Sequence, residues 1–288
     1  MSYSINLPRV SIIMNCFNGE KFLKQALDSI IYQTFKNWEL IFWDVSTSDK
    51  SKKILESYKE KRFKYFNSGT KKNLYHSRNE AIKVSNGEII SFLDCDDWWH
   101  PKKLEKQIKL FDDDSIAMVY SSYFEYHQDK NKFKKISTSK VFSGYIQNKI
   151  IYDYHIGILT TSIRKKIFDA AGGYDNFFHI CGDFEFNIRI SENNKLIGLK
   201  EHLAYYRIHN ENISKDINKE LIELEYCYEI FKKNNYENLK KFKNYLNYRK
   251  FNIALRERKI KIAFNLLLEL NFSYYKLKAL IIFCMRVF

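Results

Sequence analysis

A cluster of carboxylates follows a short apolar run near the middle of the first two hundred residues. The run EIISFLD leads directly into CDDWWHP, so Asp94, Asp96 and Asp97 lie close together in the chain. Carboxylates held close to one another repel, and each disfavours the ionisation of its neighbours unless a cation lies between them. The spacing therefore predicts a positively charged partner at this point.

The oxygen donors of Asp94 and Asp96 favour Mg2+ or Mn2+ over zinc, which prefers histidine and cysteine. An ion held in this way keeps open positions, and substrate phosphates commonly fill them. Other interpretations stay open on these residues alone. Acidic pairs are common in solvated loops, and Asp97 could cap a helix.

The segments around this cluster alternate between strand and helix patterns. Because such alternation is typical of a mainly parallel sheet covered by helices on both faces, we expect an α/β fold with ligands bound beyond the carboxyl ends of the strands. Asp44 and Asp94 both stand at such ends. The predicted strands are 9–17, 38–45, 62–68 and 88–94, and the predicted helices are 20–35, 48–60 and 74–85.

The later part of the chain has a different pattern. The segment 116–127 predicts a strand and 128–140 a lysine-rich loop or hairpin, whereas 141–213 mixes helix and strand patterns. From about Lys215 the sequence is helical, without glycine or proline. We therefore expect a main domain at 1–214, divided near residue 125, and a helical C-terminal extension at 215–288. Further predicted elements are helices at 101–111, 164–175 and from 182, and a strand at 202–209.

The bulk composition limits the classes of protein. A net charge of +14 favours nucleic acid, anionic lipid or phosphorylated compounds as partners, without choosing among them. The five cysteines form no CxxC pair, which favours reduced thiols in a cytosol. The first residues, MSYSINLPRV, lack the pattern of a signal peptide.

The last apolar segment is too short to span a membrane. The run ALIIFCM falls well below about 20 residues. The surrounding segment YYKLKALIIFCMRVF mixes bulky apolar residues with Lys276, Lys278 and Arg286, in the pattern of an interfacial helix. A last helix packed on the protein fits the same pattern, so both interpretations stay open.

Four blocks of the sequence resemble the successive blocks of family 2 glycosyltransferases, over roughly residues 8–214. They are VSIIMNCFNGEKFLKQALDSIIYQTFKNWELIFWDVSTSD, SRNEAIKVSNGEIISFLDCDDWWHPKKLEKQ, GGYDNFFHICGDFEFNIRI and YYRIHNENIS. The resemblance implies the GT-A fold, a nucleotide-diphospho-sugar donor and inversion of the anomeric centre. It also implies a nucleotide-sugar-binding half at about 1–125 and an acceptor half at 126–214.

The resemblance also implies roles for residues of the donor site. Asn15 and Asp44 would lie against the nucleoside, and Arg78 of SRN would position the nucleotide or its phosphates. Asp94 would contact the ribose or the metal. Three further residues complete the predicted site: Asp96 and His209 as metal ligands, with Mn2+ or Mg2+ as cofactor, and Cys95 as a donor contact.

Asp183 of CGDFEF matches the position of the catalytic base, which takes the proton of the acceptor hydroxyl. Many relatives have Glu-Asp here, whereas this chain has Gly182-Asp183, and Val45 stands where relatives carry a second acid. Each role has a structural alternative. Asp183 could cap a helix, Asp44 could belong to a turn, Arg78 could form a surface ion pair, and His209 could be a hydrogen-bonded histidine at a strand end.

The leading hypothesis is therefore an inverting, metal-dependent transferase that moves a sugar, UDP-linked by our expectation, to a glycan or lipid-linked acceptor. It would act in bacterial surface polysaccharide or glycoprotein assembly, in the cytoplasm or at the inner face of the membrane. Alternatives are a homologue that binds donor without turnover, a nucleotidyltransferase and a basic nucleic-acid-binding protein. Trp98 and Trp99 could stack on an acceptor sugar, although packing is expected for at least one.

Overall fold

The computed structural model describes residues 7–45, 48–70, 72–136, 141–271 and 274–287. The chain divides into two compact units. We call them the sheet unit, Met1–Ile146 with His155–Asn210, and the helical unit, Gln147–Tyr154 with Glu211–Phe288. The predicted loop at 128–140 includes residues outside the described part of the chain. The predicted extension at 215–288 does so too.

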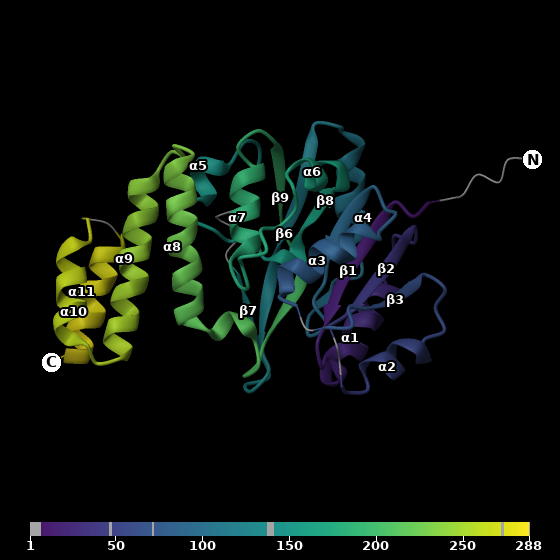
Figure 1. Cartoon of the computed structure of the whole chain (residues 1–288), viewed down its shortest axis with the longest axis horizontal. Coiled ribbons are helices and arrows are strands. Elements are labelled where there is room, and N and C mark those ends of the chain that lie inside the picture. The colour runs from purple at the N-terminus through teal and green to yellow at the C-terminus, as the bar shows by residue number, and fades with distance from the viewer. Residues whose placement is uncertain (1–6, 46–47, 71, 137–140, 272–273, 288) are drawn as a thin grey trace, which may run out of the picture. The chain divides into compact units, whose positions relative to one another are not determined.

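One large sheet forms the framework of the sheet unit (Figure 1). Its strand order is β3-β2-β1-β4-β8-β6-β9-β5, and β7 pairs with β6. The strands are β1 (Val10–Cys16), β2 (Trp38–Asp44), β3 (Phe63–Asn67), β4 (Ile89–Phe92), β5 (Trp98–Trp99), β6 (Ile116–His127), β7 (Lys132–Lys135), β8 (Ser162–Arg164) and β9 (Lys195–Ile208).

The first four strands of the sheet are parallel, as the alternating pattern predicts. Strand β1 lies between β2 and β4, and the register places Cys16 opposite Asp44 and Ile13 opposite Phe92. Strands β6 and β9 are also parallel, whereas β5, β7 and β8 pair antiparallel with their neighbours. The carboxyl ends of β1, β2 and β4 therefore meet at one edge.

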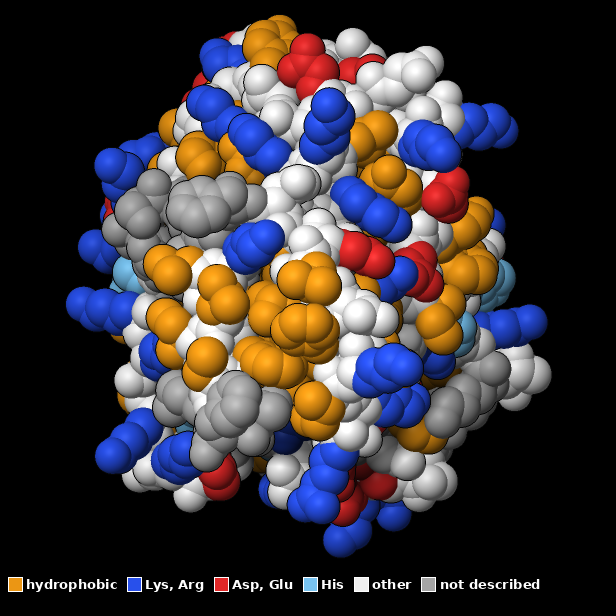
Figure 2. Space-filling model, turned by 90° about the vertical axis from the view of Figure 1, so that its left-hand side faces the viewer, with side chains coloured by type: hydrophobic (Ala, Val, Ile, Leu, Met, Phe, Trp, Pro, Cys, Tyr) orange, Lys and Arg blue, Asp and Glu red, His pale blue; other side chains and the backbone are white. Residues whose placement is uncertain are grey.

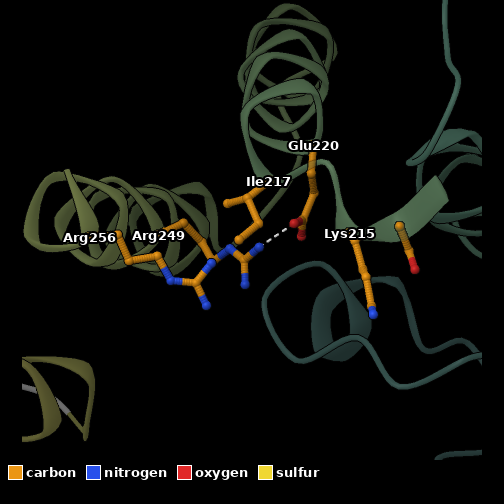
Figure 3. A pocket seen from close by; sticks show the side chains of 6 residues that line it. Lys215, Ile217, Glu220, Arg249 and Arg256 are labelled. Atoms are coloured by element: carbon orange, nitrogen blue, oxygen red, sulfur yellow. Dashed lines mark hydrogen bonds and ion pairs between the residues drawn. The ribbon is translucent and has the colours of Figure 1, made fainter. Parts of the chain in front are cut away.

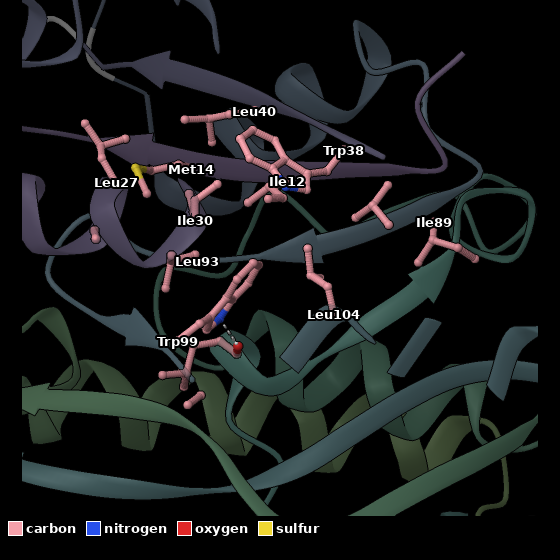
Figure 4. Packing of buried hydrophobic residues seen from close by; sticks show 14 of the residues in the cluster. Ile12, Met14, Leu27, Ile30, Trp38, Leu40, Ile89, Leu93, Trp99 and Leu104 are labelled. Carbon is pink, nitrogen blue, oxygen red and sulfur yellow. Dashed lines mark hydrogen bonds between the residues drawn. The ribbon is translucent and has the colours of Figure 1, made fainter. Parts of the chain in front are cut away.

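Helices cover this sheet because their apolar residues recur on one face. In α1 (Glu20–Ile31), Leu23, Leu27 and Ile30 are buried against β1 and β2. Trp99 closes the same core, and its indole nitrogen donates to the carbonyl of Leu159 at 2.7 Å (Figure 4). The other helices of the sheet unit are α2 (Ser51–Ser57), α3 (Leu74–Lys83), α4 (Lys103–Ile108), α6 (Lys165–Ala170) and α7 (Gly182–Ile190).

The helical unit has a second core of its own. Helix α9 packs against α8, α10 and α11, and Phe251 on α9 is fully buried there. No helix in the described part of the chain combines the length and apolarity that crossing a membrane requires. The helices are α5 (Gln147–Ile150), α8 (Ile217–Lys233), α9 (Leu239–Arg256), α10 (Ile260–Glu269) and α11 (Tyr274–Val287) (Figure 1).

Candidate functional site

Asn15 lies at the carboxyl end of β1 with its side chain buried, only 6% exposed. Neither its amide nitrogen nor its amide oxygen has a hydrogen-bond partner among the described residues. The indole nitrogen of Trp43, the register neighbour of Asn15 on β2, is also without one. Buried polar groups are almost always paired, so water or a ligand is expected at this position. The contact of Asn15 with the nucleoside stays a prediction.

Asp44 ends β2 beside this amide, and its carboxylate is held by the neighbouring strand. The hydroxyl of Tyr65 on β3 donates to Asp44 Oδ2 at 2.6 Å. The amide of Asn67 in turn donates to the Tyr65 hydroxyl at 3.2 Å. Such support fixes the orientation of a carboxylate at the edge of a site. Tyr65 is a residue that the sequence analysis did not single out.

Asp94 follows β4 and is bound by Arg78 on α3. Arg78 Nη2 donates to both carboxylate oxygens, at 2.7 and 2.9 Å, and the Arg78 side chain is only 2% exposed. Burial alone would lower the pKa of Arg78, but the charges of Asp94, Tyr75 and Tyr174 and the hydrogen bond to Asp94 together outweigh it and raise this pKa. The structural alternative of a surface ion pair does not apply to so buried an arginine. Its contact with the nucleotide stays a prediction.

Asp96 and His209 come together from distant parts of the chain. His209 Nε2 lies 2.9 Å from Asp96 Oδ2, and both side chains are partly exposed. The His209 ring also packs on Phe22, with ring centroids 5.0 Å apart. The predicted metal ligands are therefore adjacent, whereas the carboxylate of Asp94 is directed to Arg78.

This pair fits a divalent ion that takes its remaining ligands from a diphosphate. One carboxylate and one imidazole suit Mn2+, and Mg2+ is commonly bound through one or two carboxylates together with substrate phosphates. Among the described residues, no group of three or more histidine, cysteine, aspartate or glutamate side chains is placed to hold an ion. The donor set is thus incomplete without the substrate.

Asp97 has a structural task in the same loop. Its Oδ1 accepts the backbone N–H of Arg207 on β9 at 2.8 Å, and Arg207 Nε donates to the carbonyl of Asp96 at 2.8 Å. Burial raises the pKa of Asp97 well above its usual range, and the charges of Asp96 and Asp94 raise it further. Asp97 therefore ties the acidic loop to β9, two residues from His209.

Cys95 lies in the same loop, and its thiol contacts that of Cys16 at the end of β1. Both sulfurs pack on the turn before α1, since a Cβ at Gly19 would lie 2.7 Å from Cys95 Sγ and 2.8 Å from Cys16 Sγ. This contact requires glycine at the turn. The donor contact of Cys95 stays a prediction.

Asp183 stands in the first turn of α7, with its carboxylate against α3. The hydroxyl of Tyr75 on α3 lies 2.8 Å from Asp183 Oδ1, and the backbone N–H groups of Asp183 and Phe184 also bind the carboxylate. Burial raises the pKa of Asp183, while the Tyr75 hydrogen bond and the Arg78 charge oppose this rise. The backbone contacts agree with a capping role, but capping does not require burial among tyrosines.

Three aromatic residues near these groups escaped the sequence analysis. Tyr65 and Tyr75 bind the two predicted carboxylates, and Phe17 presents a half-exposed ring directly after β1. Of the two tryptophans, Trp99 is buried in the core, whereas Trp98 stacks on Tyr205 with ring centroids 5.0 Å apart. Aromatic residues are so frequent in this chain that type and spacing alone do not distinguish these positions.

A separate pocket of about 580 Å3 lies in the helical unit (Figure 3). Arg249 and Glu220 form an ion pair in it, and Arg256 lies beside them. None of the predicted site residues lines this pocket. Its other lining residues are Ser214, Lys215 and Ile217.

Comparison with known proteins identifies the family of this chain. The model of the family described as glycosyl transferase family 2 matches residues 11–172, more than half of the chain. The chain belongs to this family. A relative from Escherichia coli, the UDP-Glc:alpha-D-GlcNAc-diphosphoundecaprenol beta-1,3-glucosyltransferase WfgD, is 32% identical over 55% of this chain and 61% of its own length. The family 2 chain thus spans less than two thirds of that relative.

Solved structures of glycosyltransferases share the fold. Residues 1-349 of S. aureus TarS in complex with UDP-GlcNAc have a TM-score of 0.68 at 17% identity, covering 91% of this chain and 82% of that TarS fragment. The mannosyltransferase PcManGT from Pyrobaculum calidifontis, in complex with GDP-Man and Mn2+, has a TM-score of 0.61 at 14% identity, covering 77% and 63%. The predicted family and its α/β fold with C-terminal helices are therefore confirmed.

Proposed function

We propose that this family 2 glycosyltransferase moves a sugar from a nucleotide-diphospho-sugar, UDP-linked, to a glycan or lipid-linked acceptor, with inversion at the anomeric carbon. The observation that carries the donor site is the buried amide of Asn15, which has no partner among the described residues. A nucleobase offers the donors and acceptors that this amide lacks. Phe17 supplies an aromatic ring for stacking next to it.

Asp183 is the proposed base. Its carboxylate takes the proton of an acceptor hydroxyl as that oxygen attacks the anomeric carbon, and the bond from this carbon to the diphosphate breaks. Attack opposite the leaving group inverts the centre. Asp96 and His209 would hold Mn2+ or Mg2+, which stabilises the charge on a departing diphosphate when bound. Arg78 binds both carboxylate oxygens of Asp94 and fixes the orientation of this carboxylate.

Two comparisons support the substrate classes. WfgD is named for a UDP-Glc donor and a diphosphoundecaprenol-linked acceptor, and TarS has been solved with UDP-GlcNAc. A lipid-linked acceptor lies at a membrane, so we infer that this protein acts at the inner membrane face in surface polysaccharide assembly.

An apolar patch on the helical unit supports this location (Figure 2). Hydrophobic side chains gather on this face with lysine and arginine side chains around them, and Lys261 and Lys278 are exposed on the same helices. A basic rim around an apolar face complements an anionic lipid surface. The patch consists of residues that are 42% to 62% exposed: Phe264 and Leu268 on α10, and Leu277, Leu280 and Ile281 on α11.

Transfer itself tests the proposal. Wild-type protein is incubated with labelled UDP-sugars and undecaprenyl-diphosphate-linked acceptors in the presence of Mn2+, beside Asp183→Asn. We expect labelled lipid product from the wild type, and at least a hundredfold slower formation by the variant, about the contribution of a general base. Equal rates for both proteins would show that Asp183 is not the base. Donor binding without any product would favour the non-catalytic alternative.

A further inference from the structure

Tyr75 joins the two halves of the candidate site. It is the second residue of α3, it is buried, and the guanidinium of Arg78 lies over its ring at 5.1 Å. Its hydroxyl lies 2.8 Å from Asp183 Oδ1 and 2.8 Å from the carbonyl oxygen of Ile180. The same side chain thus contacts the arginine that binds Asp94 and the aspartate proposed as base.

Gly182 leaves the space that this ring occupies. A Cβ at Gly182 would lie 2.8 Å from three ring carbons of Tyr75, which is closer than real Cβ atoms approach their neighbours. Any side chain at residue 182 would therefore displace the ring from the first turn of α7. The tyrosine and the glycine form a matched pair, since only glycine lets the ring lie against this turn.

The hydroxyl of Tyr75 has one proton for two acceptors at 2.8 Å, Asp183 Oδ1 and the carbonyl oxygen of Ile180, and it donates to Asp183 when this carboxylate is charged. Burial raises the pKa of Tyr75 well above its usual value, and the charge of Asp183 raises it further, so the phenol keeps its proton. A hydrogen bond to a charged carboxylate is stronger than one between neutral groups. Groups around Asp183 also include the Arg78 cation, the partly buried phenol of Tyr123 and the buried phenol of Tyr174.

We propose that Tyr75 is a positioning residue that holds the Asp183 carboxylate ionised and oriented for proton transfer, and that Gly182 is required to admit its ring. This inference rests on the proposed role of Asp183 as the base. With Oδ1 bound to the phenol, the plane of the carboxylate is fixed relative to α3, the helix that also carries Arg78.

The test uses Tyr75→Phe, which removes the hydroxyl and keeps the ring against Gly182. The ionisation of Asp183 is followed by carbon NMR of the full chain labelled at its aspartate carboxyls, with Asp183→Asn identifying the resonance. We expect the pKa of Asp183 to rise, the acid limb of kcat/KM to move to higher pH, and kcat to fall about 10- to 100-fold, the range for a hydrogen bond to a charged group. The affinity for UDP should not change.

Tyr120→Phe is the matched control. This tyrosine is also buried, and its hydroxyl bonds the backbone of Phe142 at 2.8 Å, so its loss affects stability alone. An unchanged Asp183 pKa in Tyr75→Phe would overturn the inference, even where Asp183→Asn abolishes transfer. Full transfer activity of Asp183→Asn would instead show that Asp183 is not the base. The NMR titration would then decide only whether Tyr75 binds its carboxylate.

A double-mutant cycle tests the pairing of Tyr75 with Gly182. Gly182→Ala should slow transfer in the wild-type background, because the new Cβ displaces the ring. In the Tyr75→Ala background the same change should cost little more, since the space is already vacated. Equal, additive effects of Gly182→Ala in both backgrounds would contradict the matched pair.

Discussion

At the scale of single residues, the site contains two aspartates in different environments. Asp94 forms an ion pair with the buried Arg78, whereas Asp183 is partly exposed, lies against the phenol of Tyr75 and is influenced by the charge of the same arginine. A carboxylate held by an arginine has a fixed orientation, which suits ligand binding, whereas the raised pKa of Asp183 suits proton transfer. Both roles stay proposals.

The pH dependence of transfer follows from the raised pKa of Asp183. The base must be ionised to accept a proton, so kcat/KM should fall as the pH drops through this pKa. Because burial raises it, the fall should come above the ordinary aspartate value of about 3.9. A pH profile of kcat/KM measures this, with circular dichroism to confirm that the protein stays folded. An acid limb at or below the ordinary value would contradict the assignment.

Replacing Asn15 should have opposite effects on binding and stability. Asn15→Leu keeps about the same side-chain size and removes a buried amide that lacks partners among the described residues. We expect the ligand-free protein to be equally stable or more stable by about 1–3 kcal/mol. The affinity for UDP should fall at the same time, as titration calorimetry can measure. Unchanged affinity would place the base of the nucleotide elsewhere.

Removing the carboxylate of Asp96 should abolish the effect of metal on nucleotide binding. In Asp96→Ala the affinity for UDP with Mn2+ should fall to its value in EDTA, a loss of about tenfold or more for a cation that neutralises phosphate charge. Asp112→Ala is the control, because that exposed carboxylate pairs with Arg9 instead. If Mn2+ still raised the affinity of Asp96→Ala for UDP, Asp96 would not be a metal ligand.

At the scale of elements, contacts with β9 hold the loop that contains Asp94, Asp96 and Asp97. Strand β5 pairs Trp98 with Tyr205 on β9, and Asp97 accepts the backbone N–H of Arg207 on the same strand. Both contacts bring Asp96 to His209, which is 113 positions away. The proposed metal site therefore depends on how β9 is joined to the loop, as well as on Asp96 and His209 themselves.

Substitutions of Asp97 should separate its hydrogen bond from its charge. Asp97→Asn keeps an oxygen that can accept the N–H of Arg207 and removes the repulsion from Asp94 and Asp96, so the free energy of unfolding should stay equal or rise. Asp97→Ala leaves that N–H without its acceptor and should cost about 1–3 kcal/mol. Thermal or urea unfolding measures both. An unchanged free energy of unfolding in Asp97→Ala would show that this hydrogen bond does not stabilise the protein.

At the scale of the whole molecule, the sheet unit carries the proposed chemistry and the helical unit carries the apolar patch. Each unit has its own buried core. A patch of bulky apolar residues beside lysines has no task in sugar transfer as such. Contact with an anionic membrane, which we propose because the proposed acceptor is lipid-linked, would give it one.

Vesicle sedimentation tests this contact. Leu277→Ser combined with Ile281→Ser should release the protein from phosphatidylglycerol vesicles, while the wild type sediments with them and less so at high salt. The matched control is Ile213→Ser with Ile222→Ser, because these isoleucines are exposed to a similar degree, 58% and 59%, outside the patch. Equal sedimentation of both double variants would favour the alternative of helices without a lipid contact.

The sequence predicted the sheet far better than the contacts within the site. Apolar runs and helical spacing located β1 to β4 and α1 to α3, and the resemblance placed Asn15, Asp96 and Asp183. Strand β5 was missed, because two tryptophans show no alternation of their own. The contact of Tyr75 with Asp183 joins residues 108 positions apart. Such contacts depend on how α3 and α7 pack, which local patterns do not reveal.

The central claim is that a nucleotide binds at the carboxyl edge of the sheet, and ligand-dependent thermal unfolding of the intact protein tests it most directly. UDP, GDP and their sugar derivatives are each added with Mn2+, with Mg2+ and with EDTA. We predict that UDP raises the unfolding temperature and that metal enlarges the rise, since a ligand at 100 times its Kd adds about 2.7 kcal/mol. An unfolding temperature that no nucleotide changes, with or without metal, would contradict the account.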